Sequence, residues 1–203
     1  MPVSHFDPAV LKFGVLGSGK GSNFCALAEA FRVGTLGCEP VIVLSDVEDA
    51  GILAVAGAYG IPRHFVEPGS FRTRMSHEAE EKVVRLLREA RVDFVALAGF
   101  MRVIKEPLLR AFPGRILNIH PSLLPAFRGL EAWRQALEAG VHETGCTVHL
   151  VDEGVDTGRI LGQSIVPVQQ GDTNDSLHAR IQVAEHELYP RVVRKFAERL
   201  RVC

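Results

Sequence analysis

Two polar residues near the end of an apolar segment have types and spacing suited to proton transfer and hydrogen bonding. Asn118 and His120 stand two positions apart in the run Ile116 to His120, so both side chains would project from one face of a strand. The amide can donate a hydrogen bond, and the imidazole can donate one to a carbonyl oxygen or exchange a proton near neutral pH. We therefore expect both to converge on one ligand atom.

A later loop supplies carboxylates. The segment 149–158 contains three acids and two glycines, and one of the acids, Asp156, could orient His120 and stabilise its charged form. Because an adjacent carboxylate raises a histidine pKa, we predict a raised pKa for His120. The plain alternatives are a hydrogen-bonded structural histidine and a solvated acidic loop. A metal centre of His120, His149, Asp152 and Asp156 is a further alternative, although the spacing matches no known ligand motif.

A glycine-rich turn, Gly17 to Asn23, follows the first apolar run. Glycines let the backbone approach a phosphate, and the amides of the next helix would point at it. The turn is not a complete nucleotide-triphosphate loop, because Gly21 stands where Ser or Thr should hold magnesium. The dinucleotide pattern fails at Ser22, although Asp46 stands where a ribose-binding acid could lie. We predict that this turn binds one phosphate of a small substrate. The alternative is a tight turn that binds no ligand.

The elements that must position these residues alternate between apolar runs and helical patterns in the first half of the chain. The predicted strands are 12–16, 40–44, a short one near His64, and 93–97, and the predicted helices are 23–31, 52–59 and 71–90. Continuously apolar strands are shielded on both sides only when helices cover both faces of a parallel sheet. The sequence therefore predicts a doubly wound sheet.

The pattern changes in the second half. A strand at 116–120 is followed by a proline-bounded loop and a helix at 132–139, and two further runs, 146–151 and 160–168, are joined by few residues. Such a short connection favours antiparallel pairing. A final helix at 174–200 would be capped by Thr173 or Asn174 and kinked or broken at Pro190. The predicted fold is α/β, a single domain over 1–203 with a mostly parallel doubly wound sheet, helices on both faces and an antiparallel strand in the C-terminal half.

Composition and charge disfavour several classes of partner. The chain has 23 basic and 24 acidic residues, a net charge of -1, and no basic stripe of the kind that binds nucleic acid. No apolar run approaches the roughly 20 residues that span a bilayer, and the N-terminus does not resemble a secretion signal. Four scattered cysteines without a CxxC pair indicate reduced thiols. We expect a cytoplasmic enzyme with neither nucleic acid nor membrane as a partner.

Several motifs occur in an order that resembles the phosphoribosylglycinamide formyltransferases of purine synthesis. The resemblance runs from about Lys12 to Val193. The motifs that carry it are Gly21-Ser22-Asn23, Ala98 to Arg102, Asn118 to Pro125, Thr147-Val148-His149 and Asp156-Thr157-Gly158. It implies direct transfer of the formyl group of 10-formyltetrahydrofolate to the amine of glycinamide ribonucleotide, with these small molecules as partners and no metal. It also implies a monomer or a homodimer.

The resemblance further implies a role for each matched position. Asn118 and protonated His120 would stabilise a tetrahedral oxyanion, with Asp156 keeping the imidazolium charged. The substrate-binding residues would be Gly21, Ser22 and Asn23 at the phosphate and Gln182, Val183, Ala184 and Glu185 at the glycinamide and ribose. The folate-binding residues would be Arg74, Met101, Arg102, Val103, Ile104, Asn118, Asp152, Glu153, Gly154, Val155 and Asp156. The domain would then consist of an N-terminal extension at 1–11, a Rossmann-like phosphate-binding half at 12–110 and a catalytic, folate-binding half at 111–203.

Two departures and three rival functions accompany the resemblance. Trp133 stands where a histidine is expected, and Lys20 lies in the phosphate turn. Enzymes like methionyl-tRNA formyltransferase or formyltetrahydrofolate hydrolase share the central motif, but they carry a further domain for which we expect no room here. A noncatalytic phosphate-binding module would leave Asn118, His120 and Asp156 without a purpose.

Overall fold

A seven-stranded sheet forms the centre of the molecule. The computed structural model describes residues 10–202, so the predicted extension at 1–11 lies almost entirely outside the described residues. The strand order is β3-β2-β1-β4-β5-β6-β7. The strands are β1 Lys12–Leu16, β2 Glu39–Ser45, β3 Arg63–Phe65, β4 Phe94–Leu97, β5 Ile116–His120, β6 Glu143–Leu150 and β7 Ile160–Pro167. The first five are parallel, and β6 pairs antiparallel with both β5 and β7, which confirms the predicted topology.

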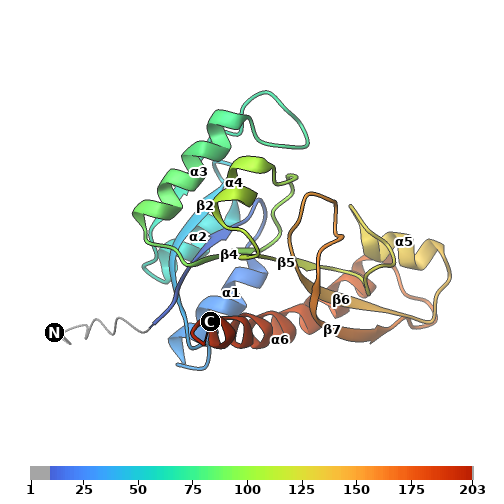
Figure 1. The fold of residues 1–203 in the computed structure, drawn as a ribbon. Coiled ribbons are helices and arrows are strands. Elements are labelled where there is room, and N and C mark those ends of the chain that lie inside the picture. The colour runs from blue at the N-terminus through green and yellow to red at the C-terminus, as the bar shows by residue number, and fades with distance from the viewer. Residues whose placement is uncertain (1–9, 203) are drawn as a thin grey trace.

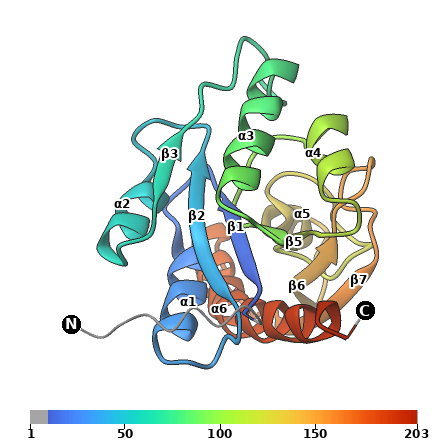
Figure 2. The ribbon, with the colours of Figure 1, turned by 60° about the vertical axis from the view of Figure 1, so that its left-hand side comes forward.

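Helices cover both faces of this sheet. They are α1 Ser22–Arg32, α2 Gly51–Ala58, α3 His77–Glu89, α4 Glu106–Ala111, α5 Ala132–Glu138 and α6 Asn174–Leu200. Figure 1 shows α1 and α6 on one side of the sheet and α3 and α4 on the other, and Figure 2 shows the same layers after a turn. Two separate apolar clusters fill these layers, one including Phe24 of α1 and Tyr189 of α6, the other Val83 of α3 and Leu108 of α4.

Two helices on one face of the sheet differ from the sequence prediction. The helix predicted at 71–90 begins at His77, because the Ser76 side chain accepts a hydrogen bond from the Ala79 amide and caps the helix there. Residues 71–74 instead form a loop that pairs with Val103. The short helix α4 was not predicted, since six residues are too few for a helical period to stand out.

The last helix does not end at Pro190. α6 continues through it to Leu200. Thr173 caps the start of the helix in a capping box with Ser176, which confirms one of the two predicted cap residues. Apolar side chains buried along the whole helix, from Leu177 to Phe196, hold it against the sheet. The stabilisation from this packing outweighs the loss of the backbone hydrogen bond that Pro190 cannot donate.

The strand order brings three predicted site segments to one edge of the sheet. β1, β4 and β5 are parallel neighbours, so their carboxyl ends lie together, where ligands bind in open α/β sheets. In the antiparallel pair β5 and β6, Asn118 stands opposite His149 and His120 opposite Thr147. No helix among residues 10–202 has the length and apolar character needed to cross a bilayer.

Candidate active site

Asn118 is held by a histidine on the neighbouring strand. Asn118 Nδ2 lies 3.2 Å from Nε2 of His149, which is 2% exposed. The other ring nitrogen, Nδ1, faces the Leu150 carbonyl oxygen at 2.8 Å. A carbonyl only accepts, so Nδ1 carries a proton. Nε2 can then accept from the Asn118 amide when the ring is neutral, or donate to Asp156 when it is charged.

His120 meets Asp156 as the sequence predicted. His120 Nδ1 lies 3.4 Å from Asp156 Oδ2, and both side chains are nearly buried. On its other side, Nε2 of His120 lies 2.8 Å from the Phe127 carbonyl oxygen. Both ring nitrogens therefore face protein acceptors. The second of these acceptors belongs to the loop between β5 and α5.

Asp156 connects the two histidines and the loop. Its Oδ1 lies 3.5 Å from Nε2 of His149, and its Oδ2 accepts a 2.9 Å hydrogen bond from the Gly129 amide. Asp156 has a positive φ of 52°, a conformation that aspartate tolerates better than most residues. Burial alone would raise the Asp156 pKa, but the hydrogen bond from His149 and the charge of His120 outweigh it, and the pKa is lowered. The carboxylate therefore stays charged.

The predicted rise in the His120 pKa was wrong. Burial is the largest influence, and it lowers the pKa because it disfavours the charged imidazolium. Asp156 and the Phe127 carbonyl raise the pKa, but less than burial lowers it. The neutral ring is favoured in the unliganded site, although Asp156 acts in the predicted direction.

His149 is the member of this group whose role the sequence analysis missed. It was considered only as part of a motif and of a metal centre. Its link to Asn118 depends on the pairing of β5 with β6, which joins residues 31 positions apart. If the pairing of β5 with β6 had been known, His149 could have been recognised as a polar residue on a buried strand position opposite Asn118.

The glycine-rich turn ends in the conformation that a close approach requires. Gly21 has a φ of 83° and precedes α1, whose cap residue makes no side-chain hydrogen bond. A Cβ at this position would lie 2.7 Å from the Ile52 backbone, so glycine is needed both for the conformation and for space. The first amides of α1, from Ser22 and Asn23, are thus without a side-chain cap from Gly21 and suit an anion.

Two predicted substrate-binding residues contact each other. Asn23 Nδ2 donates a 2.9 Å hydrogen bond to Glu185 Oε2, which joins α1 to α6. Burial raises the pKa of Glu185 to about 7, and the bond from Asn23 lowers it by less. Asn23 Oδ1 is buried without a hydrogen-bond partner. Such a group is a candidate for a ligand contact.

The other predicted residues on α6 differ in environment. Gln182 is half-buried, with Nε2 3.4 Å from Nε2 of His178, whereas Val183 is 61% exposed. Ala184 packs against the core. The unexpected Trp133 stacks on His178 with ring centroids 3.8 Å apart, so His178 lies between Trp133 and its hydrogen-bonding partner Gln182.

The predicted folate-binding residues at 101–104 form a loop after β4. Met101 is 61% exposed, whereas Ile104 is buried. A cavity of about 580 Å³ is lined by Ile104, Leu109 and Glu153 together with Lys105, Glu106 and Arg110. This cavity brings together two predicted folate residues from separate loops. Arg74 lies over the ring of Phe71 at 4.0 Å, and its backbone pairs with Val103.

The acidic loop is ordered by its own aspartate. Asp152 Oδ1 accepts hydrogen bonds from the Gly154 amide at 3.1 Å and the Thr157 hydroxyl at 2.6 Å. Its carboxylate therefore bonds within the loop. Within residues 10–202, no group of three or more histidine, cysteine or acidic side chains is arranged to hold a metal ion. Val155, in the same loop, is half exposed.

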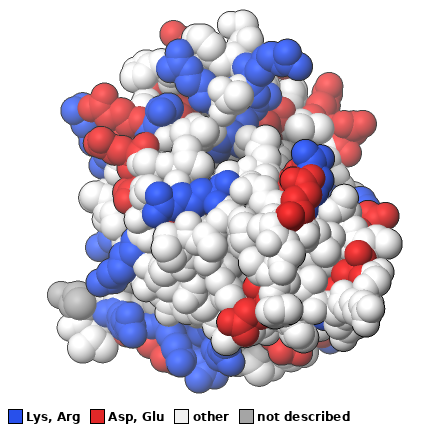
Figure 3. All heavy atoms as spheres, turned by 90° about the vertical axis from the view of Figure 1, so that its right-hand side faces the viewer, with Lys and Arg blue, Asp and Glu red and all other residues white. Residues whose placement is uncertain are grey.

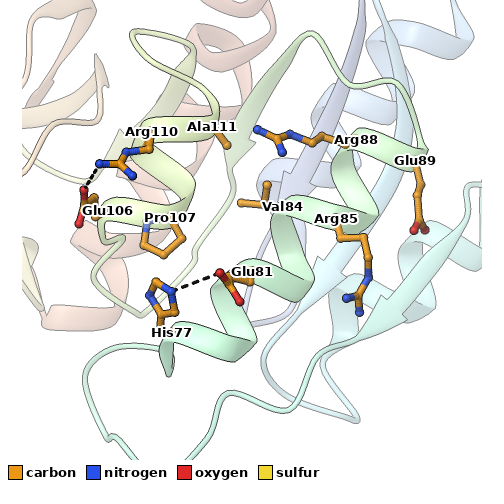
Figure 4. A pocket seen from close by; sticks show the side chains of 10 residues that line it. All are labelled: His77, Glu81, Val84, Arg85, Arg88, Glu89, Glu106, Pro107, Arg110 and Ala111. Carbon is orange, nitrogen blue, oxygen red and sulfur yellow. Dashed lines mark ion pairs between the residues drawn. The ribbon is translucent and has the colours of Figure 1, made fainter.

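A second cavity adjoins the first and shares Glu106 and Arg110 with it. It has a volume of about 510 Å³ and lies between α3 and α4, and Figure 4 shows its charged lining. Two ion pairs, Glu81 with His77 and Glu106 with Arg110, occupy its rim. Figure 3 shows a different face, in which basic and acidic side chains are scattered around a mainly uncharged centre, without a basic stripe across it.

Comparison with known proteins agrees with this geometry. The formyl transferase family model matches residues 11–193. The phosphoribosylglycinamide formyltransferase of Bacillus subtilis is 40% identical over 184 residues, which cover 91% of this chain and 93% of that protein. The trifunctional purine biosynthetic protein adenosine-3 of Drosophila pseudoobscura pseudoobscura is 48% identical over 181 residues, or 88% of this chain. The match spans only 13% of that longer protein.

A solved structure gives the same result for the fold. The glycinamide ribonucleotide transformylase 1 of Symbiobacterium toebii superimposes with a TM-score of 0.90 at 46% identity, covering 96% of this chain and 91% of that one. The family model and these similarities cover the glycine turn, the β5 centre and the acidic loop together. The chain belongs to the formyl transferase family, and within it resembles the phosphoribosylglycinamide formyltransferases.

Proposed function

We propose that this protein transfers the formyl group of 10-formyltetrahydrofolate to the amine of glycinamide ribonucleotide. The observation that carries the proposal is the convergence of Asn118, His120 and Asp156 at the end of β5. The strand lies two places along the sheet from the glycine turn that follows β1. A phosphate-bearing amine and a formyl donor could thus meet at one edge of the sheet.

The reaction is a direct transfer between two nitrogens. The substrate amine forms a bond to the formyl carbon, and the formyl oxygen becomes an oxyanion in the tetrahedral intermediate. The bond to N10 of the folate then breaks, and the proton lost by the amine ends on N10. Donors placed at an oxyanion typically contribute about 3 to 4 kcal/mol each to lowering the barrier.

In this mechanism Asn118 and His120 are the oxyanion donors. The Asn118 NH₂ group has two hydrogens, so it can keep its bond to His149 and offer the other to the formyl oxygen. His120 Nε2 must leave the Phe127 carbonyl to reach the same oxygen. Asp156 lies beside Nδ1 and favours the charged imidazolium, the form in which Nε2 carries a proton to donate to the formyl oxygen.

The two substrate sites follow from the surrounding contacts. The amides of Ser22 and Asn23 would bind the phosphate, with Glu185 and Gln182 beside the ribose and glycinamide. Ile104 and Glu153 line the cavity that would receive part of the folate, and Met101 to Val103, which precede Ile104 in the same loop, would contact another part of it. No metal takes part in this mechanism. Cys25, Cys38 and Cys146 are free thiols, which supports a cytoplasmic site of action.

An assay of formyl loss tests this function. The protein is incubated with 10-formyltetrahydrofolate in the presence and absence of glycinamide ribonucleotide, and the folate product is followed by its absorbance. We expect loss of the formyl group only when the ribonucleotide is present. Loss at the same rate without it would indicate a hydrolase. Activity only with free formate and ATP would also contradict the proposal.

A further inference from the structure

Arg102 makes contacts that do not suit a folate ligand. Its Nε donates to Asp46 Oδ2 at 2.5 Å, and its Nη1 donates to the carbonyl oxygens of Phe71 at 2.6 Å and Arg74 at 3.2 Å. The side chain is only 16% exposed, and that of Asp46 only 4%. Arg102 therefore points into the protein, where it joins the end of β2 to the loop before α3.

Asp46 extends this connection to the glycine turn. Its second oxygen, Oδ1, accepts a 2.5 Å hydrogen bond from the Ser18 hydroxyl. The Ser18 oxygen in turn accepts from the Met101 amide at 3.0 Å, and the Ser18 amide donates to the Gly99 carbonyl at 3.0 Å. Both oxygens of Asp46 are thus engaged by other residues of the protein, Ser18 and Arg102, rather than pointing freely toward the ribose considered in the sequence analysis.

We propose that Asp46 and Arg102 are positioning residues, which tie the phosphate-binding turn to the two loops of the folate site. This inference rests on the proposed function for the identity of the two ligands. The tie joins Ser18 in the phosphate-binding turn, Met101 after β4, and the 71–74 loop that carries Arg74. Neither Asp46 nor Arg102 needs to touch a substrate to affect how both substrates bind.

The energetics of burial make the pair sensitive to single substitutions. Removal of one partner from a buried ion pair leaves the other charge without compensation, which is strongly unfavourable. Without Asp46, the Arg102 guanidinium would lose its counterion and its anchor on β2. The 71–74 loop would then lose the anchor that Arg102 provides and keep contacts such as the bond from the Val103 amide to the Thr73 carbonyl at 2.9 Å.

A cross effect distinguishes positioning from direct binding. Asp46 adjoins the glycine turn, yet Asp46→Asn should raise the KM for 10-formyltetrahydrofolate. Arg102 adjoins the folate loops, yet Arg102→Met should raise the KM for glycinamide ribonucleotide. We expect each variant to raise both KM values by about fivefold or more, with kcat within about threefold of wild type, because the reacting groups are untouched.

Arg194→Met is the matched control. Arg194 pairs with Glu198 on the exposed C-terminal part of α6, and exposed pairs contribute little. Its loss should leave both KM values unchanged. If Arg102→Met raises only the folate KM while Asp46→Asn leaves both within twofold, Arg102 is a folate ligand and the proposal is overturned.

Hydrogen exchange of the substrate-free protein tests the tie independently of activity. Amides in peptides covering residues 18–19, 71–74 and 101–104 should exchange faster in Asp46→Asn and Arg102→Met than in wild type or Arg194→Met, with the rest of the sheet unchanged. Unchanged exchange in those peptides would overturn the proposal. If wild type transfers no formyl group, the proposed function fails, whereas the exchange result still decides whether the tie exists.

Discussion

The side chains of His120 and Asp156 lie 3.4 Å apart between Nδ1 and Oδ2, yet the pKa of the histidine is lowered by its burial. The carboxylate opposes this effect without reversing it. The site therefore holds a neutral imidazole poised for charging, because Asp156 remains ionised. A formyl oxygen that gains negative charge beside the ring would add to the influence of Asp156.

Asp156→Asn should lower the pKa of His120 further, because the variant keeps the size of the side chain and removes its charge. Titration by NMR of the ring protons of His120, in wild type and variant, measures this directly. An unchanged His120 pKa would show that the carboxylate serves another purpose.

The same pair predicts how stability depends on pH. The folded-state pKa of Asp156 is lowered, so its contribution to stability is complete above the unfolded pKa and is lost as pH falls through the folded value. The His120 pKa is also lowered, so the neutral ring stabilises the fold above its unfolded pKa and this contribution too disappears on acidification. Both contributions to stability are therefore lost as the pH falls, each through its own folded-state pKa.

His149→Phe should lower kcat more than it raises either KM. The substitution keeps a ring but removes the nitrogen that faces Asn118 Nδ2 and Asp156, so the amide donor is no longer held in place. We expect a loss of about tenfold to a hundredfold in kcat, less than for removal of a donor itself. Steady-state kinetics with His64→Phe as the exposed control measure the effect. A kcat within twofold of wild type would show that Asn118 needs no such support.

Ser22→Asp tests the phosphate site. A carboxylate at the first position of α1 would lie against the substrate phosphate, where two negative groups repel. The KM for glycinamide ribonucleotide should rise by about tenfold or more, corresponding to about 1.4 kcal/mol. The KM for the folate and the value for Ser22→Ala are the controls. If the ribonucleotide KM stays within about twofold, the phosphate binds elsewhere.

Glu185→Gln should make the protein more stable in alkaline solution. The pKa of Glu185 is raised from 4.5 to about 7, so its favourable contribution is complete below the unfolded pKa and is lost as pH rises through about 7. The neutral amide avoids this loss and can still accept the bond from Asn23. Urea unfolding at pH 5 and pH 9 should show a relative gain of roughly 1 to 3 kcal/mol for the variant at the higher pH. An equal difference at both pH values would mean that Glu185 titrates normally.

The sequence was sufficient for the features that depend on local patterns. The strands at 12–16 and 116–120 are mainly apolar and were predicted with their observed bounds, and the period of two along a strand was enough to place Asn118 and His120 on one face. The contact between His120 and Asp156 was also expected, although the reason is not local: β6 is antiparallel to β5 and ends beside Ile116, so the following loop must turn back to bring Asp156 to His120.

Features that depend on distant pairing could not be predicted. The bond between Arg102 and Asp46 joins residues 56 positions apart, and each residue alone is an ordinary charge at a strand end. The balance at His120 also depends on the depth of burial, which no local pattern measures. The start of α3 at His77 depends on a single hydroxyl, that of Ser76, which caps the helix. The helical pattern of the sequence was extended further upstream, to residue 71.

The kinetics of His120→Ala, Asp156→Asn and the double variant test the central claim most directly, that the pair acts as one unit on the formyl group. Each single substitution should lower kcat by about two powers of ten or more, while the Kd for the folate changes much less. The double variant should lose less than the product of the two single losses, because either change disables the same unit. Losses that multiply fully, or single losses below about threefold, would contradict the account.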